Sequence, residues 1–180
     1  MDIKTLCLGV LNRGDASGYE IKKLFEEGPL NHIHAASFGA IYPALNALSE
    51  DGLLVGTEMA QQKRPDKKIY SITEKGRAAL FDALMAPPAP DRVRSDFLFI
   101  LFFAHLLPAS RLAALIDQRI AWYRECLARM ESCDLQTRPA GEVFVHGLGL
   151  AVYRAAADYL SEHRARLLDE ISAEHRLVAE

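Results

Sequence analysis

A local excess of basic side chains is the part of the sequence with the clearest chemistry. The stretch 61–68 holds one acidic residue and four basic ones, Lys63, Arg64, Lys67 and Lys68. Lysine and arginine gathered in this way bind phosphate groups such as those of the nucleic-acid backbone. The formal net charge of the chain is −3, so a positively charged surface is expected only at this turn. The alternative is a solvated hairpin tip that merely resists edge pairing.

A helix expected within residues 36–54 offers a second group of polar side chains. Ser37 is placed to cap its first turn, and Asp51-Gly52 is placed to end it, since a helix terminus favours a left-handed glycine. Its apolar stripe comprises Ile41, Leu45, Leu48 and Leu53. Its other faces carry Ser37, Gly39, Tyr42 and Asn46. Such a helix fits a DNA major groove, the alternative being one more helix packed in a bundle.

The sequence contains no pattern typical of catalysis or of metal binding. His32 and His34 have no further ligand nearby and are expected to be loop histidines. Cys7, Cys126 and Cys133 are too scattered for a disulfide framework and are expected to be reduced thiols, buried or half-buried. Neither a nucleophile elbow nor a glycine-rich phosphate loop occurs. We therefore expect neither an enzyme nor a bound cofactor.

The first half of the chain contains the elements that would position both polar groups. Apolar residues at helical spacing predict a first helix over residues 3–11. Ser17 and Glu20 form a capping box for a second helix, which presents Ile21, Leu24 and Phe25 inward. Alternation after Gly52 predicts two strands, one with Leu53, Val55, Thr57 and Met59 on one side and one containing Ile69, Tyr70 and Ile72. Thr73 then caps a helix over 74–85 with the stripe Leu80, Phe81 and Leu84.

Three helices, a two-stranded hairpin with a basic tip and a further helix follow the order of a winged helix-turn-helix module. In that module the third helix enters the major groove and the wing lies along the phosphate backbone. We assign it to residues 1–85. The prolines of residues 86–91 cannot continue a helix and predict a linker. Residues 92–180 are predicted to be all-helical, so the fold class is mainly α.

The second half is predicted to contain a buried apolar helix that is capped by Ser95 or Asp96 and ends near Leu107. Pro108 suits the start of the next helix, which carries a heptad-like stripe, Leu112, Ile116, Ile120, Tyr123, Leu127 and Met130. The last helix runs from about residue 142 to 173 with Leu148, Val152, Ala156, Tyr159, Leu160, Leu167 and Ile171 on one side. Because this apolar surface exceeds what a winged module needs for support, we expect a homodimerisation domain.

At this point the sequence closely resembles the PadR-like family of winged-helix transcriptional regulators. The resemblance rests on Gly18-Tyr19-Glu20-Ile21, on the run from Gly39 through Tyr42-Pro43 to Gly52-Leu53-Leu54, and on Lys68-Ile69-Tyr70-Ser71-Ile72-Thr73-Glu74-Lys75-Gly76. It covers the N-terminal half in register. The C-terminal half resembles the helical dimerisation domain of the longer members in helix order and length.

The resemblance implies a homodimeric repressor that binds an inverted-repeat DNA operator and releases it when a small-molecule effector appears. It assigns DNA contacts to Ser37, Gly39 and Tyr42 on the recognition helix, to Tyr19 and to the wing residues Lys67 and Lys68. Family recognition helices often carry a basic residue where this chain has Asn46 or Ala47. Affinity is therefore expected to depend more strongly on the wing, including Lys63 and Arg64.

An effector, aromatic or apolar in character, would bind between the domains or at the dimer core. Its candidate lining is Phe99, Phe103, Trp122 and Tyr153, although aromatic residues at helical spacing are often plain core. The acidic balance keeps a second function open, a ligand-binding or protein-interaction dimer without specific operator binding. With no secretory signal and no apolar run long enough to span a membrane, we expect a cytoplasmic protein.

Overall fold

The structure, a computed structural model, describes residues 1–26, 38–59, 67–91 and 93–178. The chain divides into two compact units, Met1–Asp91 and Arg92–Glu180. Each is described by itself. Helices dominate both, and a small antiparallel sheet in the first unit completes the winged-helix architecture that the sequence predicts.

The helices of the first unit begin at residues whose side chains accept backbone hydrogen bonds. Asp2 caps α1 (Ile3–Leu11) by accepting from the Thr5 N–H at 2.8 Å. Ser17 precedes α2 (Gly18–Glu26), and Thr73 caps α4 (Glu74–Met85) by accepting from the Gly76 N–H at 3.0 Å. The caps at Ser17 and Thr73 agree with the sequence-based prediction, which named no cap for α1. Helix α3 (Ile41–Glu50) instead follows a short 3-10 helix, η2 (Phe38–Ala40), and has no side-chain cap bond.

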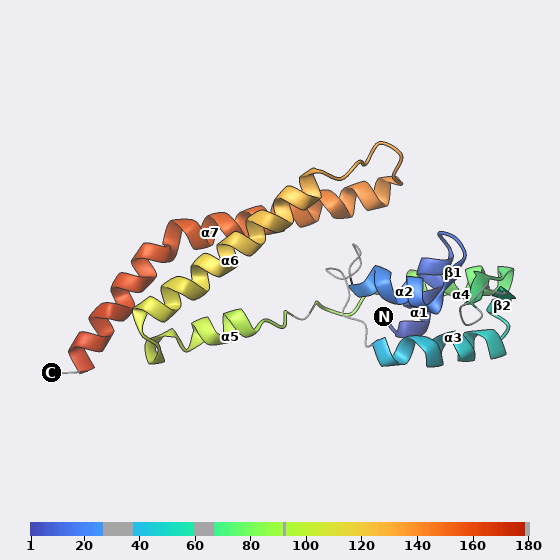
Figure 1. The fold of residues 1–180 in the computed structure, drawn as a ribbon, viewed down its shortest axis with the longest axis horizontal. Coiled ribbons are helices and arrows are strands. Elements are labelled where there is room, and N and C mark those ends of the chain that lie inside the picture. Colours follow the sequence, from blue (N-terminus) through green and yellow to red (C-terminus); the bar gives the residue numbers. More distant parts are fainter. Residues whose placement is uncertain (27–37, 60–66, 92, 179–180) are drawn as a thin grey trace. The chain divides into compact units, whose positions relative to one another are not determined.

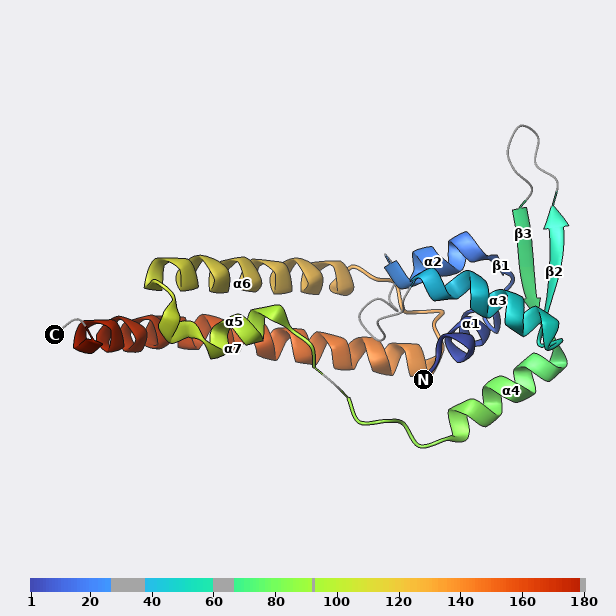
Figure 2. The same cartoon turned by 90° about the horizontal axis from the view of Figure 1, so that it is seen from below.

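The sheet has the order β1-β3-β2 and pairs antiparallel throughout. Strands β2 (Leu54–Met59) and β3 (Lys67–Ile72) form the predicted wing hairpin (Figure 2). In this hairpin Gly56 pairs with Tyr70. Strand β1 (Ala16–Ser17) pairs with β3 and was not predicted, because two residues are too few to show an alternating pattern. The described part of the wing is thus fastened to the start of α2.

The core of the first unit gathers the buried faces of α1, α2, α3, β3 and α4. Its most buried large side chains are Leu11, Ile21, Phe25, Ile41, Leu45 and Leu48. Three residues predicted to face the core lie outside it: Leu24, Phe81 and Leu84 are exposed. Val55 and Thr57 lie on one side of β2, as predicted, and both are exposed, whereas Leu54 is buried; Leu53 belongs to the preceding turn.

A glycine turn joins α3 to the wing and to α4. Gly52 has a φ of 70°, and the N–H of Leu53 donates to the Leu48 carbonyl at 2.9 Å, a Schellman ending of α3. The Leu53 carbonyl in turn accepts from the N–H of Thr73 at 3.1 Å and from its hydroxyl at 3.1 Å. A β-carbon on Gly76 would collide with that same carbonyl oxygen. The segment around Gly52 and the segment around Gly76 therefore contact each other at the Leu53 carbonyl.

The second unit is built on a pair of long antiparallel helices, α6 (Ala109–Glu131) and α7 (Ala140–Val178), which lie side by side (Figure 1). Arg164 donates to both carboxylate oxygens of Asp117 at 2.7 Å, and Arg154 donates to Glu131 at 2.7 Å. Helix α7 extends beyond the predicted range at both ends. Buried residues between the helices include Leu112, Ile116, Ile120, Cys126, Ala157 and Ile171.

The apolar segment before α6 differs from its prediction. Ser95 caps α5 (Asp96–Phe102), as expected, but the helix ends at Phe102 and a 3-10 turn, η3 (Ala104–Leu106), follows. Only Phe97 and Ala104 are buried there, so the prediction of a buried helix is wrong for the single chain. Three of the seven residues of the predicted α7 stripe are likewise exposed, namely Leu148, Val152 and Tyr159. None of the described helices is long and apolar enough to cross a membrane.

We expect Gly76→Ala to destabilise the first unit by about 2 kcal/mol, because the new methyl group displaces the start of α4 from the Leu53 carbonyl. Urea denaturation followed by far-UV circular dichroism measures this as a lower midpoint. Gly9→Ala is the matched control, since Gly9 also lies in a helix but has open space where a β-carbon would stand. That variant should gain stability by about 0.5–1 kcal/mol. Equal effects of the two substitutions would contradict the proposed contact.

Candidate nucleic-acid interface

Helix α3 has one face in the core and one face open to solvent. Ile41, Ala44, Leu45 and Leu48 are buried, whereas Tyr42 and Asn46, four residues apart, are exposed. Pro43 is tolerated because the first turn of a helix has no intrahelical partner for its missing N–H. Gly39 in η2 is also exposed, while Ser37 lies outside the described residues. The structure thus brings Gly39, Tyr42 and Asn46 to the accessible side of one helical segment.

Tyr42 rests against the beginning of α2. A β-carbon on Gly18 would lie 2.6 Å from Cε1 of the Tyr42 ring, closer than such contacts allow. The ring is nevertheless 51% exposed, so one of its faces remains open to a partner. Tyr19, the next residue of α2, is 67% exposed. Glycine at position 18 is therefore what permits the observed placement of Tyr42.

The two described lysines of the wing have different surroundings. They lie in strand β3 and not in the turn to which the sequence pattern assigned them. Lys67 Nζ donates to Glu20 Oε1 at 2.8 Å. Lys68 lies with its stem against Gly56, and its Nζ is 5.4 Å from the centre of the Tyr70 ring. Lys63 and Arg64 fall outside the described residues.

Glu20 connects the capping box of α2 to the wing. Its Oε2 accepts from the Ser17 N–H at 2.8 Å and from the Ser17 hydroxyl at 2.7 Å, and the Glu20 N–H donates back to that hydroxyl at 3.3 Å. Its other oxygen accepts from Lys67. The hydrogen bonds from Lys67 and from Ser17 lower the pKa of Glu20 to about 2. The sequence pattern predicted the cap but missed the lysine, because 47 residues separate the two partners.

Comparisons with known proteins agree with this geometry. The model of the "Transcriptional regulator PadR-like family" matches residues 7–82, which span α1 to α4. The "Negative transcriptional regulator PadR" of Bacillus subtilis (strain 168) is 29% identical over 134 residues, which cover 74% of this chain and 62% of that relative. The crystal structure of smu.1604c from Streptococcus mutans UA159 is 31% identical, covers 92% of this chain and 99% of the other, and has a TM-score of 0.80.

The first unit is a PadR-like domain. Its resemblance to the family, stated from motifs, is confirmed. The fold of the whole chain is also that of Bacillus subtilis PadR in complex with operator DNA, at 24% identity, 91% and 98% coverage and a TM-score of 0.76. A structure of the same protein in complex with p-coumaric acid has 24% identity, 92% and 98% coverage and a TM-score of 0.68.

The structure gives physical reasons for the motifs of this PadR-like domain. In the Gly18-Tyr19-Glu20 motif, glycine makes room for the Tyr42 ring, tyrosine is exposed and glutamate holds Lys67. In the motif that ends at Gly76, Lys75 Nζ donates to the Asp51 carbonyl at 2.8 Å and so ties α4 to the end of α3. These contacts hold α2, α3, α4 and the wing together.

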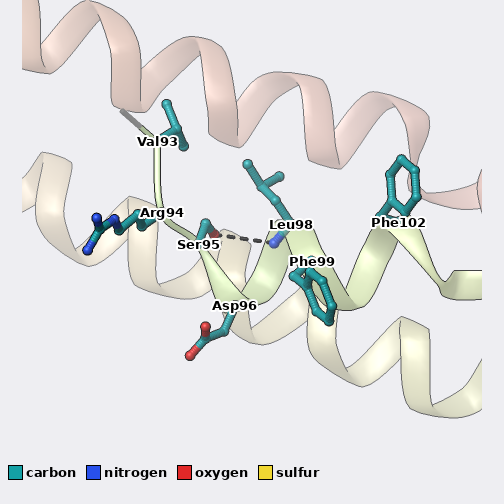
Figure 3. Close-up of a pocket in the computed structure, with 7 residues that line it drawn as sticks. All are labelled: Val93, Arg94, Ser95, Asp96, Leu98, Phe99 and Phe102. Carbon is teal, nitrogen blue, oxygen red and sulfur yellow. Dashed lines mark hydrogen bonds between the residues drawn. The ribbon is translucent and has the colours of Figure 1, made fainter. Parts of the chain in front are cut away.

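The aromatic residues predicted to line an effector cavity form two groups in the second unit. Phe99 and Phe103 contact each other with ring centres 5.1 Å apart, and Trp122 and Tyr153 do so at 5.6 Å. Phe99 lines an open pocket of about 450 Å³ at the start of α5 (Figure 3). Trp122 lines a second pocket, of about 270 Å³, together with Phe97, Leu115, Gln118 and Arg119.

The cysteines and histidines of the described chain form no cluster of three or more metal-ligand side chains. His32 and His34 fall outside the described residues. Burial raises the pKa of the Cys7 thiol to about 11, which keeps it protonated in the core. Cys126 is buried as well, but Cys133 is exposed, so its predicted burial is wrong: it follows the end of α6, where no neighbouring helix covers it.

We expect the Glu20 ion pair to make stability depend on acid pH. Because folding lowers the pKa of Glu20 from 4.5 to about 2, its contribution is complete above about pH 4.5 and disappears as pH falls towards 2. Glu20→Gln should lower the free energy of unfolding at pH 7 by no more than about 1 kcal/mol, since both side chains are partly exposed. Urea denaturation at several pH values measures the difference from the native sequence. A difference that stays constant from pH 7 to pH 3 would contradict the assignment.

Proposed function

We propose that this chain is a homodimeric transcriptional repressor that binds an inverted-repeat DNA operator and is released from it by a small aromatic or apolar effector. The observation that carries the proposal is the two-sided character of α3. Its buried leucines anchor it in the core, and its opposite side presents Tyr42 and Asn46 beside a wing that carries lysine. The operator complex of Bacillus subtilis PadR supports the same use of the fold.

In this proposal, α3 reads the major groove and its surroundings hold the DNA backbone. Tyr42 and Asn46 contact base edges, with Ser37 and Gly39 at the leading end of the helix. Tyr19 and Lys68 contact phosphates, together with Lys63 and Arg64. We assign Lys67 to holding the wing instead, because its ammonium group already donates to Glu20.

Two apolar faces in the second unit support dimerisation. On α5 and the turn that follows it, Leu98, Phe99, Phe102, Phe103 and Leu106 are exposed at spacings of three and four residues. On α7, Phe144, Leu148, Val152 and Tyr159 are exposed on one side. Monomeric proteins rarely expose contiguous apolar patches of this kind. A second copy that covers these faces would place two α3 helices in successive major grooves, roughly 34 Å apart.

A relative and two groups of aromatic residues support the proposal of repression and effector release. The Bacillus subtilis relative is described as a negative regulator, and its structure with p-coumaric acid shows that it accepts a small aromatic ligand. The corresponding site here would be at the Phe99–Phe103 or the Trp122–Tyr153 group. Such a ligand releases DNA only if it binds more tightly to a dimer geometry that does not fit the operator.

Fluorescence anisotropy with the DNA upstream of the protein's own gene and with a random duplex, at two salt concentrations, tests DNA binding. We expect a preference of about a thousandfold for the upstream fragment. Tyr42→Ala should reduce this preference, because it removes a base contact. Lys68→Ala should weaken binding to both duplexes alike and reduce the salt slope by about 1, because it removes a phosphate contact. Weak and equal binding to both duplexes by the native protein would favour the alternative, a protein-interaction or ligand-binding dimer.

The double substitution Leu148→Glu with Val152→Glu should convert the dimer to a monomer, because it places two charges in the proposed interface. Analytical ultracentrifugation should then give 20.0 kDa in place of twice that mass. Ala165→Glu is the matched control, an exposed position on another side of α7. It should leave the dimer intact. A native protein that sediments as a monomer would contradict the proposed architecture.

A further inference from the structure

The Glu20–Lys67 ion pair has a consequence for DNA selectivity, and the inference below rests on the proposed DNA binding. Lys67 is 34% exposed and its ammonium group is 2.8 Å from Glu20. Glu20 is itself held by two hydrogen bonds from Ser17, so the carboxylate cannot follow the lysine outward without breaking the start of α2. Lys67, the first residue of β3, is therefore restrained against the start of α2.

The neighbouring lysine is not restrained in this way. Lys68 is exposed and its described contacts are its stem on Gly56 and its ammonium group above the Tyr70 ring, neither of which neutralises its charge. Phosphate attraction is independent of sequence and grows with each cation that reaches the backbone. Each lysine that is removed from this attraction lowers the affinity for random DNA.

We propose that Glu20 is a specificity-determining residue: by holding Lys67 against the start of α2, it withdraws one cation from non-specific phosphate binding and keeps the wing beside α3. Glu20 acts through Lys67 and is a positioning residue, with no DNA contact of its own. A freed Lys67 would attract phosphates on any duplex, so the effect on preference comes from the position of the wing. With the wing held beside α3, both elements contact an operator together, which binding to random DNA does not require. On an operator the base contacts of α3 contribute in addition.

The test is a double-mutant cycle between Glu20→Gln and Lys67→Ala, read by anisotropy on a random duplex over a range of salt concentrations. Glu20→Gln should raise the affinity for random DNA about threefold and steepen the salt slope by about 1, since one further lysine reaches a phosphate. The preference for the upstream fragment should fall. In the Lys67→Ala background, the steepening should be absent.

Two further variants separate this effect from simpler ones. Glu58→Gln removes the same charge from strand β2, opposite Lys68, where Glu58 has no ion pair with any described residue. It should raise affinity slightly and equally in both backgrounds. Ser17→Ala removes the hydroxyl bond to Glu20 but keeps the bond from the Ser17 backbone N–H and the Lys67 ion pair, so Glu20 stays in place and the salt slope should not change. Circular dichroism confirms that each variant is folded.

Each of the following results would overturn the inference. If Glu20→Gln steepens the salt slope equally with and without Lys67, the effect of Glu20 is one of net charge alone. Weaker binding of random DNA by Glu20→Gln, or a slope change in Ser17→Ala like that in Glu20→Gln, would make Glu20 a structural cap only. If the native protein binds neither duplex, the proposed function fails and the inference fails with it, whereas native binding with no coupling overturns the inference alone.

Discussion

The carbonyl group of Leu53 is the contact on which the arrangement of the first unit depends. The N–H of Leu53 donates to the Leu48 carbonyl at the end of α3. The Leu53 carbonyl accepts two hydrogen bonds from Thr73, which lies between β3 and α4. A single turn thereby determines where the recognition helix stops, where the wing starts and how α4 packs. Glycine is required on both sides of it, at Gly52 for its backbone conformation and at Gly76 for lack of space.

Local patterns in the sequence were sufficient for most elements of this fold. Caps at Ser17, Thr73 and Ser95, and the helix end at Gly52, depend on residues within three or four positions of each other. Prediction failed for elements that depend on a residue far away in the sequence. Strand β1 exists only because β3 lies beside it.

The candidate site was predictable in composition and less so in geometry. Tyr42 and Asn46 are exposed on α3 as helical periodicity requires. Lys67 pairs with Glu20, and the Tyr42 ring packs against Gly18. Both contacts join segments that are far apart in the sequence, so the spacing of residues along the chain does not predict them. The exposure of the apolar faces of α5 and α7 was not predicted for a similar reason. A pattern of apolar residues predicts burial, but it does not identify the surface that would cover those residues.

The contact between the Tyr42 ring and Gly18 also limits the side-chain entropy that Tyr42 can lose on binding a partner. A long side chain that moves freely before binding loses about 0.5–1.5 kcal/mol of rotational freedom when a partner immobilises it. The Tyr42 ring is already confined on one side by the backbone of α2 while its other side stays open. The protein is thus preorganised at this position, and much of that ordering takes place when the chain folds and not when it meets its target.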